Sequence, residues 1–369
     1  MEVDAVIGRG SLLGLISNGM SFLAGLFKKK QSESVVLIDI GAASVAGAYV
    51  HYKEGETPAL LYTRRLPIEI RKEEPREAAM LRALSILCEN LIREGSPILV
   101  RTVGNGSVDN ILVSIDAPWQ ETNVRTESFE KKDDFIFTKS MVAKVLEQTK
   151  DVRQKKIVVD ESIIGTILNG YETSDPYGKK AHRASIVILT SLIDQRIASS
   201  VTSIVQSAYH TKRIFPITDS SLRYQALCYA FPHEHDMLIL DAMEPTTSIA
   251  LIRRGLFVDM TEVPAESGAT GSSQWIEKVT STFSKLAERY PLPRTIFLLA
   301  QQTKTASLQK RLSSANLGSL WLSDNPPTIV SVLASHIVSF IRQITTAAPD
   351  LPLLLMALYY QARGKRWGF

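Results

Sequence analysis

Short apolar runs that end at turn residues recur along the first third of the chain. Residues 34–41 read Ser-Val-Val-Leu-Ile-Asp-Ile-Gly, a run rich in β-branched residues that stops at Asp39 and Gly41. Runs of this length and composition predict β-strands, and apolar residues that repeat every three or four positions predict a helix. The pattern predicts a hairpin, a third strand, a helix and a fourth strand, at residues 34–41, 45–50, 60–67, 76–93 and 110–115.

The same order of elements returns about two hundred residues later. Both first strands end on an aspartate, Asp39 and Asp241, and both third strands end on a proline, Pro67 and Pro264. Agreement of this kind indicates an internal repeat, and we interpret the chain as two related halves. The second series comprises residues 237–241, 247–252, 257–264, 272–290 and 295–299.

The segment between the two series has a pattern of its own. It contains a charged run at residues 130–134, helical spacing over residues 140–150, and turn signals at Asn169-Gly170 and Asp175-Pro176. These features predict a small α/β subdomain inserted into the first half. Later in the chain, apolar residues at helical spacing predict a helix over residues 328–345. The predicted organisation is a terminal segment (1–33), the first half (34–106 and 191–235), the insertion (107–190), the second half (236–348) and a C-terminal helix with a basic, aromatic tail (349–369).

The N-terminal segment contains an apolar run followed by basic residues. Residues 11–27 carry no charge, and Lys28-Lys29-Lys30 follow directly. The larger apolar side chains share one helical face, which is typical of a helix lying in the membrane interface, and the lysines would be attracted to anionic lipid. The alternative is a tail or a helix docked on the protein itself, so the sequence leaves the two interpretations open.

Composition narrows the class of protein but names no partner. The 369 residues carry a net charge of +4, which is too mild to predict a nucleic-acid partner. Cys88 and Cys228 are the two cysteines, so a disulfide framework or a cysteine zinc site is excluded and a reducing cytoplasm fits. His233 and His235 stand two residues apart, and a solvated turn is favoured there over a metal site.

The two aspartate-headed hairpins resemble the phosphate motifs of the actin, Hsp70 and sugar-kinase superfold. The resemblance implies an α/β fold with duplicated actin-like, ribonuclease H-like domains and the small α/β subdomain inserted in the first half. It also implies that the hairpins grip the phosphates of ATP, with Mg²⁺ held through water by Asp39 and Asp241. The residues that would bind this cofactor are Asp39, Gly41, Ser44, Asp241, Thr246 and Thr247.

Two bacterial relatives within the superfold are suggested by local stretches. Residues 170–178 and 183–190 resemble a stretch of FtsA, the actin homologue that tethers the FtsZ ring to the membrane. Residues 352–364 resemble the ending of PilM, the actin-like scaffold of type IV pili. The sequence favours the FtsA-like interpretation, with a PilM-like protein as the alternative.

Three departures from the family pattern predict a weakened nucleotide site. Met243-Glu244-Pro245 stand where relatives carry glycines, which removes a donor N–H and adds a negative charge. Ala300-Gln301-Gln302 replace a Gly-Gly pair at the purine-binding turn. Phe215 stands where FtsA carries a glutamate that orients the attacking water. We therefore predict weak or absent ATP hydrolysis, with binding of ATP and Mg²⁺ doubtful.

The expected function is that of a membrane-associated, actin-like scaffold at the cytoplasmic face of the inner membrane. The resemblance implies an FtsZ-like or pilus-assembly protein as the partner, and self-association of the chain. An active ATPase whose polymerisation is gated by nucleotide is the other reading that the sequence leaves open.

Overall fold

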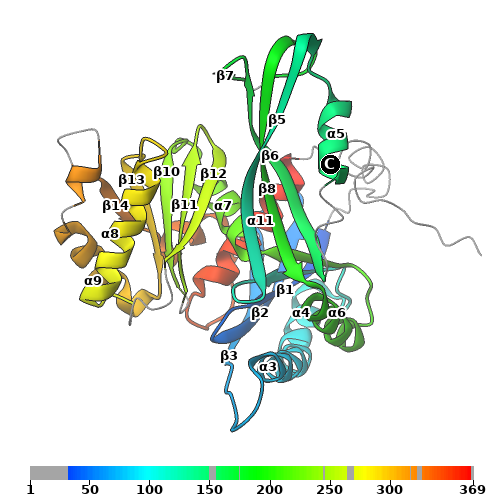
Figure 1. Cartoon of the computed structure of the whole chain (residues 1–369). Helices are drawn as coiled ribbons and strands as arrows, with labels where there is room; N and C mark the ends of the chain where they lie inside the picture. The colour runs from blue at the N-terminus through cyan, green and yellow to red at the C-terminus, as the bar shows by residue number, and fades with distance from the viewer. Residues whose placement is uncertain are drawn as a thin grey trace, which may run out of the picture.

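The structure, a computed structural model, describes residues 32–148, 155–173, 175–243, 246–263, 270–315, 317–321 and 326–366. It contains two lobes and an arm that projects between them (Figure 1). The expectations for the apolar N-terminal run, for Glu244 and Pro245, and for the last three residues lie outside these ranges. None of the helices within the described residues has the length and apolar character that crossing a membrane requires.

The first lobe is built on a six-stranded sheet whose order is β15-β3-β2-β1-β4-β9. The central strand β1 pairs antiparallel with β2 and parallel with β4. Both faces of β1 are buried, because Val35 and Leu37 pack into one cluster while Val36 and Ile38 pack into another. A strand covered on both sides needs apolar residues throughout, which explains its uninterrupted run. The strands are β1 (Ser32–Ile40), β2 (Ser44–Lys53), β3 (Ala59–Pro67), β4 (Asn110–Ile115), β9 (Ile214–Thr218) and β15 (Arg342–Gln343).

The second lobe repeats this arrangement in a five-stranded sheet whose order is β12-β11-β10-β13-β14. Its central strand β10 pairs antiparallel with β11 and parallel with β13, as β1 does with β2 and β4. The predicted duplication is therefore confirmed at the level of strand order and direction. The strands are β10 (Met237–Ala242), β11 (Thr247–Arg253), β12 (Leu256–Val263), β13 (Thr295–Ala300) and β14 (Thr328–Ser331).

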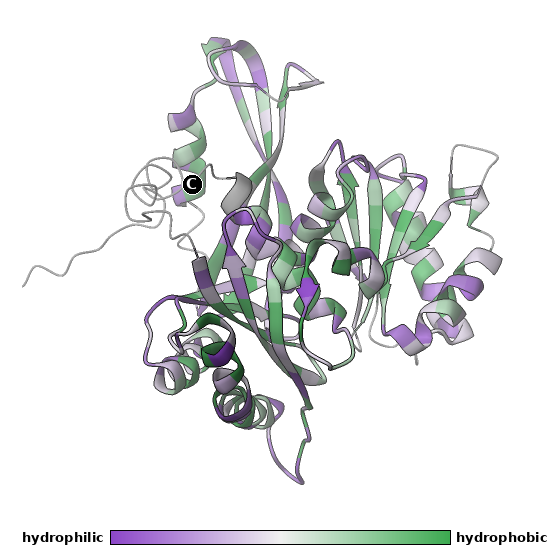
Figure 2. Cartoon of the chain, turned by 180° about the vertical axis from the view of Figure 1, so that it is seen from behind, coloured by the Kyte–Doolittle hydropathy of each residue, from purple (hydrophilic) through white to green (hydrophobic). Residues whose placement is uncertain are grey.

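Helices cover both sheets on both faces. One cluster joins the outer face of the first sheet to α3 (Arg76–Asn90) and α6 (Gln195–Tyr209), with α4 (Ser96–Val103) beside them. Another cluster joins the outer face of the second sheet to α8 (Ser273–Ala287) and α9 (Gln302–Ser314). Hydrophobic residues, green in Figure 2, concentrate along the central strands, where both faces are covered.

Two helices lie between the lobes. The helices α7 (Asp219–Ala230) and α11 (Leu351–Arg366) share a cluster that includes inward-facing residues of both β1 and β10. Residues 353–358 of α11 are almost completely buried. This layer forms a single core between the two halves, so the last helix of the chain joins them together.

The arm is an antiparallel sheet of order β5-β8-β6-β7 with one helix, α5 (Lys139–Gln148), on one face. Its strands are β5 (Gln120–Ile136), β6 (Lys156–Leu168), β7 (Tyr171–Glu172) and β8 (Lys180–Asp194). We call residues 116–194 the inserted subdomain. The predicted insertion, residues 107–190, is wrong at its start, because residues 110–115 form β4 and pair with β1 in the main sheet.

The helix expected over residues 328–345 is also wrong. The segment forms β14 (Thr328–Ser331), the short helix α10 (Ala334–Ile337) continued by a 3-10 turn (Val338–Phe340), and the short strand β15. β14 pairs in parallel with β13, and β15 pairs with β3 of the other lobe. Pairing with an edge of each sheet thus has more effect on this segment than the helical spacing of its apolar residues. Strand pairing satisfies backbone groups that a lone helix would leave exposed at its ends.

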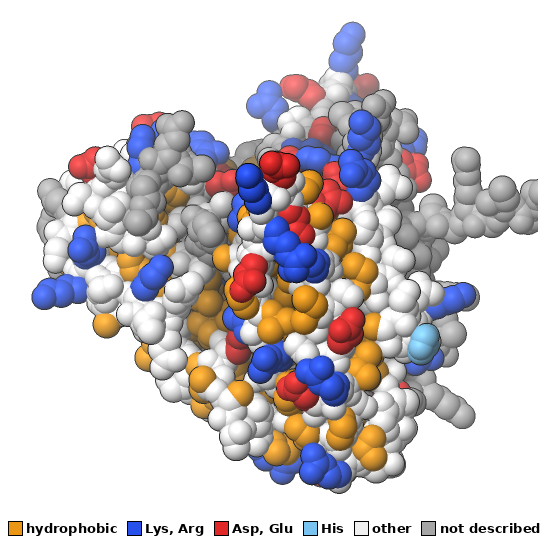
Figure 3. All heavy atoms as spheres, turned by 90° about the horizontal axis from the view of Figure 1, so that it is seen from below, with side chains coloured by type: hydrophobic (Ala, Val, Ile, Leu, Met, Phe, Trp, Pro, Cys, Tyr) orange, Lys and Arg blue, Asp and Glu red, His pale blue; other side chains and the backbone are white. Residues whose placement is uncertain are grey.

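Surface charge is mixed on the face seen from below in Figure 3. Basic and acidic side chains are interspersed there, with apolar side chains between them. The described part of this face therefore presents no one-sign field of the kind that attracts a polyanion.

Candidate functional site

The two hairpin aspartates occupy equivalent places in the two halves. Along β1, Val35 and Leu37 face the core between the lobes, and the alternation of the strand directs Asp39 to the same side. Along β10, Met237 and Ile239 do the same and place Asp241 on that side. Both carboxylates are almost fully buried, with 3% and 9% of the residue exposed. A buried carboxylate requires a partner, so the surrounding cations decide what the site does.

Asp39 is held by an arginine of its own sheet. Arg65 Nη2 donates a 2.9 Å hydrogen bond to Asp39 Oδ2, and Arg65 Nη1 donates to Ser44 Oγ at 2.7 Å. The same guanidinium donates from Nε and Nη2 to both carboxylate oxygens of Asp350, at 2.7 and 2.9 Å. Burial lowers the pKa of Arg65, but its bonds to Asp350 and its attraction to Asp39 outweigh burial and raise the pKa above its ordinary value. Arg65 therefore stays charged and joins the first hairpin to the start of α11.

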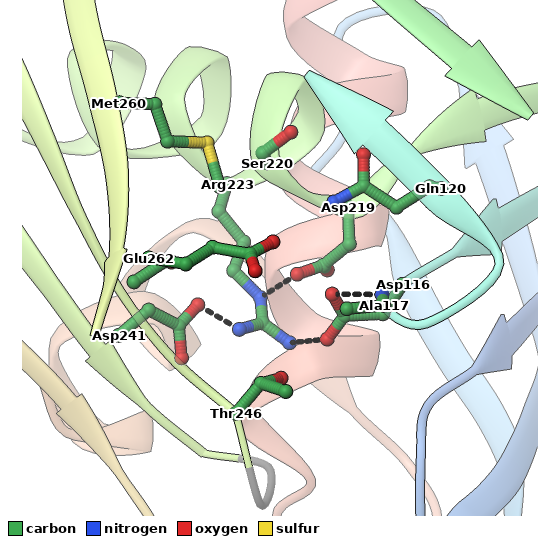
Figure 4. A pocket seen from close by; sticks show the side chains of 11 residues that line it. Asp116, Ala117, Gln120, Asp219, Ser220, Arg223, Asp241, Thr246, Met260 and Glu262 are labelled. Atoms are coloured by element: carbon green, nitrogen blue, oxygen red, sulfur yellow. Dashed lines mark hydrogen bonds and ion pairs between the residues drawn. The ribbon is translucent and has the colours of Figure 1, made fainter. Parts of the chain in front are cut away.

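Asp241 is held by an arginine from the other half. Arg223 of α7 donates from Nη1 to Asp241 Oδ2, and its Nε lies 2.6 Å from Asp219 Oδ2 (Figure 4). Its Nη2 lies 3.7 Å from Asp116 Oδ2, which follows β4. The Arg223 side chain is only 6% exposed. Burial raises the pKa of Asp116, while the charge of Arg223 opposes this rise. One guanidinium thus neutralises carboxylates from both halves of the molecule.

The cavity beside Arg223 is small and acidic. It measures about 20 Å³, which is enough for about one water molecule. Gln120, Thr246 and Glu262 are among the residues that line it (Figure 4). Four acidic side chains, namely Asp116, Asp219, Asp241 and Glu262, therefore surround one arginine.

Comparison with known proteins gives the fold. No protein-family model matches the chain, and no curated protein matches its sequence. Among solved structures, one described as a PilM-PilN type IV pilus biogenesis complex superposes with a TM-score of 0.54 at 12% identity, covering 89% of this chain and 98% of that one. The chain has an actin-like fold.

Two further solved structures superpose less well. A Bacteroides thetaiotaomicron protein with an actin-like ATPase fold and unknown function has a TM-score of 0.43 at 10% identity, with coverage of 89% of this chain and 96% of that one. The ethanolamine utilization protein EutJ from Carboxydothermus hydrogenoformans has a TM-score of 0.37 at 11% identity, with coverage of 95% and 98%. The strand order repeated in the two lobes, together with the superposition on the PilM-PilN structure, confirms the predicted duplicated, actin-like architecture.

The residues predicted to bind phosphate differ in their roles in the structure: some lie at the arginines, and others support the local fold. Asp39 and Ser44 meet at Arg65, and Asp241 and Thr246 line the cavity beside Arg223. The backbone of Gly41 closes the first hairpin turn by donating to the Ser44 carbonyl at 2.9 Å. Thr247 is different, because its Oγ1 accepts a 3.0 Å hydrogen bond from the indole of Trp275 on α8. It therefore supports the packing of the second lobe.

The structure fully describes two of the three places where the sequence departs from the family's nucleotide-binding pattern. Gln301, at the start of α9, donates from Nε2 to the Met243 carbonyl at 3.4 Å, so its side chain ties the turn after β13 to the turn after β10. Phe215 of β9 pairs with Leu112 of β4. The residues in register with Asp39 across the sheet are instead Ser114 on β4 and Ile217 on β9. The Phe215 ring packs under Arg363, with the guanidinium 5.5 Å from the centroid. The acidic residue that this stretch of chain contributes to the site is therefore Asp219, four residues after Phe215.

The predicted site residues did not include the two cations of the site or four of its carboxylates, namely Arg65, Arg223, Asp116, Asp219, Glu262 and Asp350. A local signal existed for one pair, since Asp219 and Arg223 are four residues apart on a helix. No such signal links Arg65 to Asp350, which are 285 residues apart. Among the described residues, no three His, Cys, Asp or Glu side chains are grouped so as to hold a metal ion.

Proposed function

We propose that this chain is an actin-like scaffold that works without hydrolysing ATP. The observation that carries the proposal is that the aspartates of both hairpins are ion-paired with the chain's own arginines. In the superfold that the hairpins resemble, these aspartates hold Mg²⁺ through water. Here a guanidinium supplies the positive charge at each of them.

The residues present do not fit a magnesium nucleotide. Hydrated Mg²⁺ needs carboxylate oxygens that are free to accept from its waters. Arg65 and Arg223 already donate to Oδ2 of Asp39 and of Asp241, and Oδ1 of Asp241 accepts from the Met243 backbone. Without the metal, phosphates would face the four carboxylates around Arg223 and would be repelled. A nucleotide would therefore have to break two buried ion pairs before it could bind.

The proposed role is that of a pilus-type assembly scaffold at the cytoplasmic face of the inner membrane. The likeness to the structure of the PilM-PilN complex supports this direction, together with the PilM-like ending at residues 352–364. The apolar run at residues 11–27 and its three lysines support attachment to the membrane surface. An FtsZ-like partner, self-association and a role in division remain predictions from the resemblance to FtsA.

Calorimetric titration of the full chain with ATP and Mg²⁺ tests the central claim. We expect no binding heat at micromolar nucleotide, while an ATP-binding actin-like protein titrated under the same conditions gives the positive control. An affinity in the low micromolar range would overturn the proposal. Two companion measurements address its other parts.

The first is co-sedimentation with anionic liposomes, in which the full chain is expected to pellet more than a chain that starts at Gln31. Equal pelleting would reject attachment through the N-terminal segment. The second is co-expression with a PilN-type protein or with FtsZ, followed by size-exclusion chromatography. Co-elution with the PilN-type protein alone is expected. Co-elution with FtsZ alone would contradict the pilus-type role and support a role in cell division.

A further inference from the structure

The first turn of α7 carries contacts on two different faces. Successive helical residues are about 100° apart, so Asp219 and Arg223 share one face while Ser220 and Ser221 point elsewhere. Asp219 and Arg223 face the cavity and pair with each other, and Arg223 also reaches Asp241. Ser220 and Ser221 form hydrogen bonds to the inserted subdomain, and Ser220 also lines the cavity. A single helical turn therefore touches both the inserted subdomain and the second half.

The contacts to the inserted subdomain are short and come from two of its strands. Thr122 of β5 lies 2.8 Å, oxygen to oxygen, from Ser220. Ser221 Oγ donates to Asp160 Oδ2 of β6 at 2.6 Å and accepts from Gln225 Nε2 at 3.2 Å. A hydrogen bond to a carboxylate is stronger than one between neutral groups, so the bond to Asp160 fixes the turn firmly to β6.

One of the contacts of α7 with the second half is a buried ion pair. Arg223 reaches from α7 to Asp241 on β10, and both side chains are largely shielded from water. Shielding strengthens the attraction between the charges and makes separation costly, because each charge would then be buried without a partner. The pair is therefore sensitive to small displacements of the helix that carries Arg223.

The helix itself is built to move as one body. Leu222, Ala226 and Leu227 are completely buried in the core between the lobes and pack with α11. Close-packed cores transmit displacement instead of absorbing it. A shift imposed on Ser220 and Ser221 thus moves the backbone that positions Arg223.

We propose that the first turn of α7 is a mechanical link that couples the position of the inserted subdomain to the closure of the two halves. Arg223 is its positioning residue: with the inserted subdomain seated, the Arg223–Asp241 pair holds the halves together, and displacement of the subdomain releases the pair. The proposal goes beyond the scaffold function and does not depend on it, because the link works whether or not nucleotide binds.

Hydrogen-exchange mass spectrometry of the full chain tests the link. The double variant Ser220→Ala/Ser221→Ala removes the two hydroxyls of α7 that form hydrogen bonds to the inserted subdomain. We expect backbone exchange in β10 and β11 of the second half to rise by about fivefold or more, the lower range of typical coupling between sites. Ser128→Ala is the matched control, since Ser128 makes a 3.2 Å contact with Ser185 inside the inserted sheet and does not touch α7.

Coupling must also act in the reverse direction. Asp241→Asn weakens the pair from the second half, and we expect faster exchange in the first residues of β5 and in β6, where no atom has been changed. Thr122→Val offers a milder change from the side of the inserted subdomain if the serine variant does not fold. The proposal is overturned if the folded variants raise exchange only in the element that carries the substitution.

Discussion

The guanidinium of Arg65 lies 2.9 Å from the carboxylate of Asp39, although the two residues stand on strands that are not neighbours. Ala46 of the intervening strand β2 is in register with both of them. Its methyl side chain leaves space for the long arginine to pass over β2. A row of three residues across the sheet thus places a permanent cation at the first hairpin.

Replacing Arg65 tests how much this arrangement stabilises the protein. Arg65→Met leaves the carboxylates of Asp39 and Asp350 without their main partner, and we expect a loss of about 1–3 kcal/mol in the free energy of unfolding. Urea unfolding followed by circular dichroism measures it. Arg64→Met, at an exposed position on the same strand, is the control and should change little. Equal effects of the two substitutions would contradict a structural role for the Arg65 ion pairs.

Arg223 is more deeply buried, so its removal should cost more. Arg223→Met is expected to destabilise the protein by about 3–5 kcal/mol, because it leaves several carboxylates buried together. Adding Asp241→Asn to this variant should recover part of the loss, since one of those charges is then gone. Chemical denaturation of the single and double variants gives the comparison. Strictly additive losses would show that the two residues do not interact.

Gly95 is predicted to tolerate no side chain. A β-carbon at this position would lie 2.6 and 2.7 Å from ring atoms of Tyr49 and 2.9 Å from Tyr62. Both rings are fixed against the first sheet, so Gly95→Ala should cost about 1–3 kcal/mol through overpacking. Gly318→Ala is the control, because nothing lies within 4 Å of its β-carbon. The two variants can be compared by urea unfolding, and a neutral Gly95→Ala would contradict the close packing.

The thiol of Cys88 should be inert in the folded protein. The residue is buried, and burial raises its pKa to about 12, so almost no thiolate forms at pH 8. Iodoacetamide at pH 8 should therefore modify Cys88 only after unfolding by urea, as judged by peptide mass mapping. Cys228 is partly exposed and serves as the internal comparison. Rapid alkylation of Cys88 in native conditions would refute its burial.

One surface ion pair should contribute to the acid sensitivity of the fold. Hydrogen bonds from the Arg82 side chain and the Arg71 backbone lower the pKa of Glu74 to about 2. A lowered pKa in the folded state means that the stabilisation is complete above the ordinary pKa of glutamate and is lost as the pH falls towards 2. Glu74→Gln should therefore flatten the fall in the urea midpoint between pH 5 and about 2.5. Glu147→Gln on the exposed side of α5 is the control, and an equal flattening there would reject the assignment.

Local pattern was a good guide to the central strands and a poor guide to the segment before α11. The central parts of β1 and β10 are buried on both faces, so their sequences had to be apolar there, and each strand ends one residue after the aspartate that interrupts the run. Residues 328–345 carry apolar side chains at a spacing that fits a helix. They form strands because edges of both sheets were available to pair with them.

The sequence by itself determined the duplication, the places of the two hairpins and the aspartate that ends each first strand, because these follow from residues close together in the chain. Only the tertiary structure decided which charges meet those aspartates. Arg65 pairs with Asp350 across 285 residues, and Arg223 reaches Asp241 from the other half of the molecule. An ion pair depends on proximity in space and on the burial that strengthens it, and neither is written in local spacing.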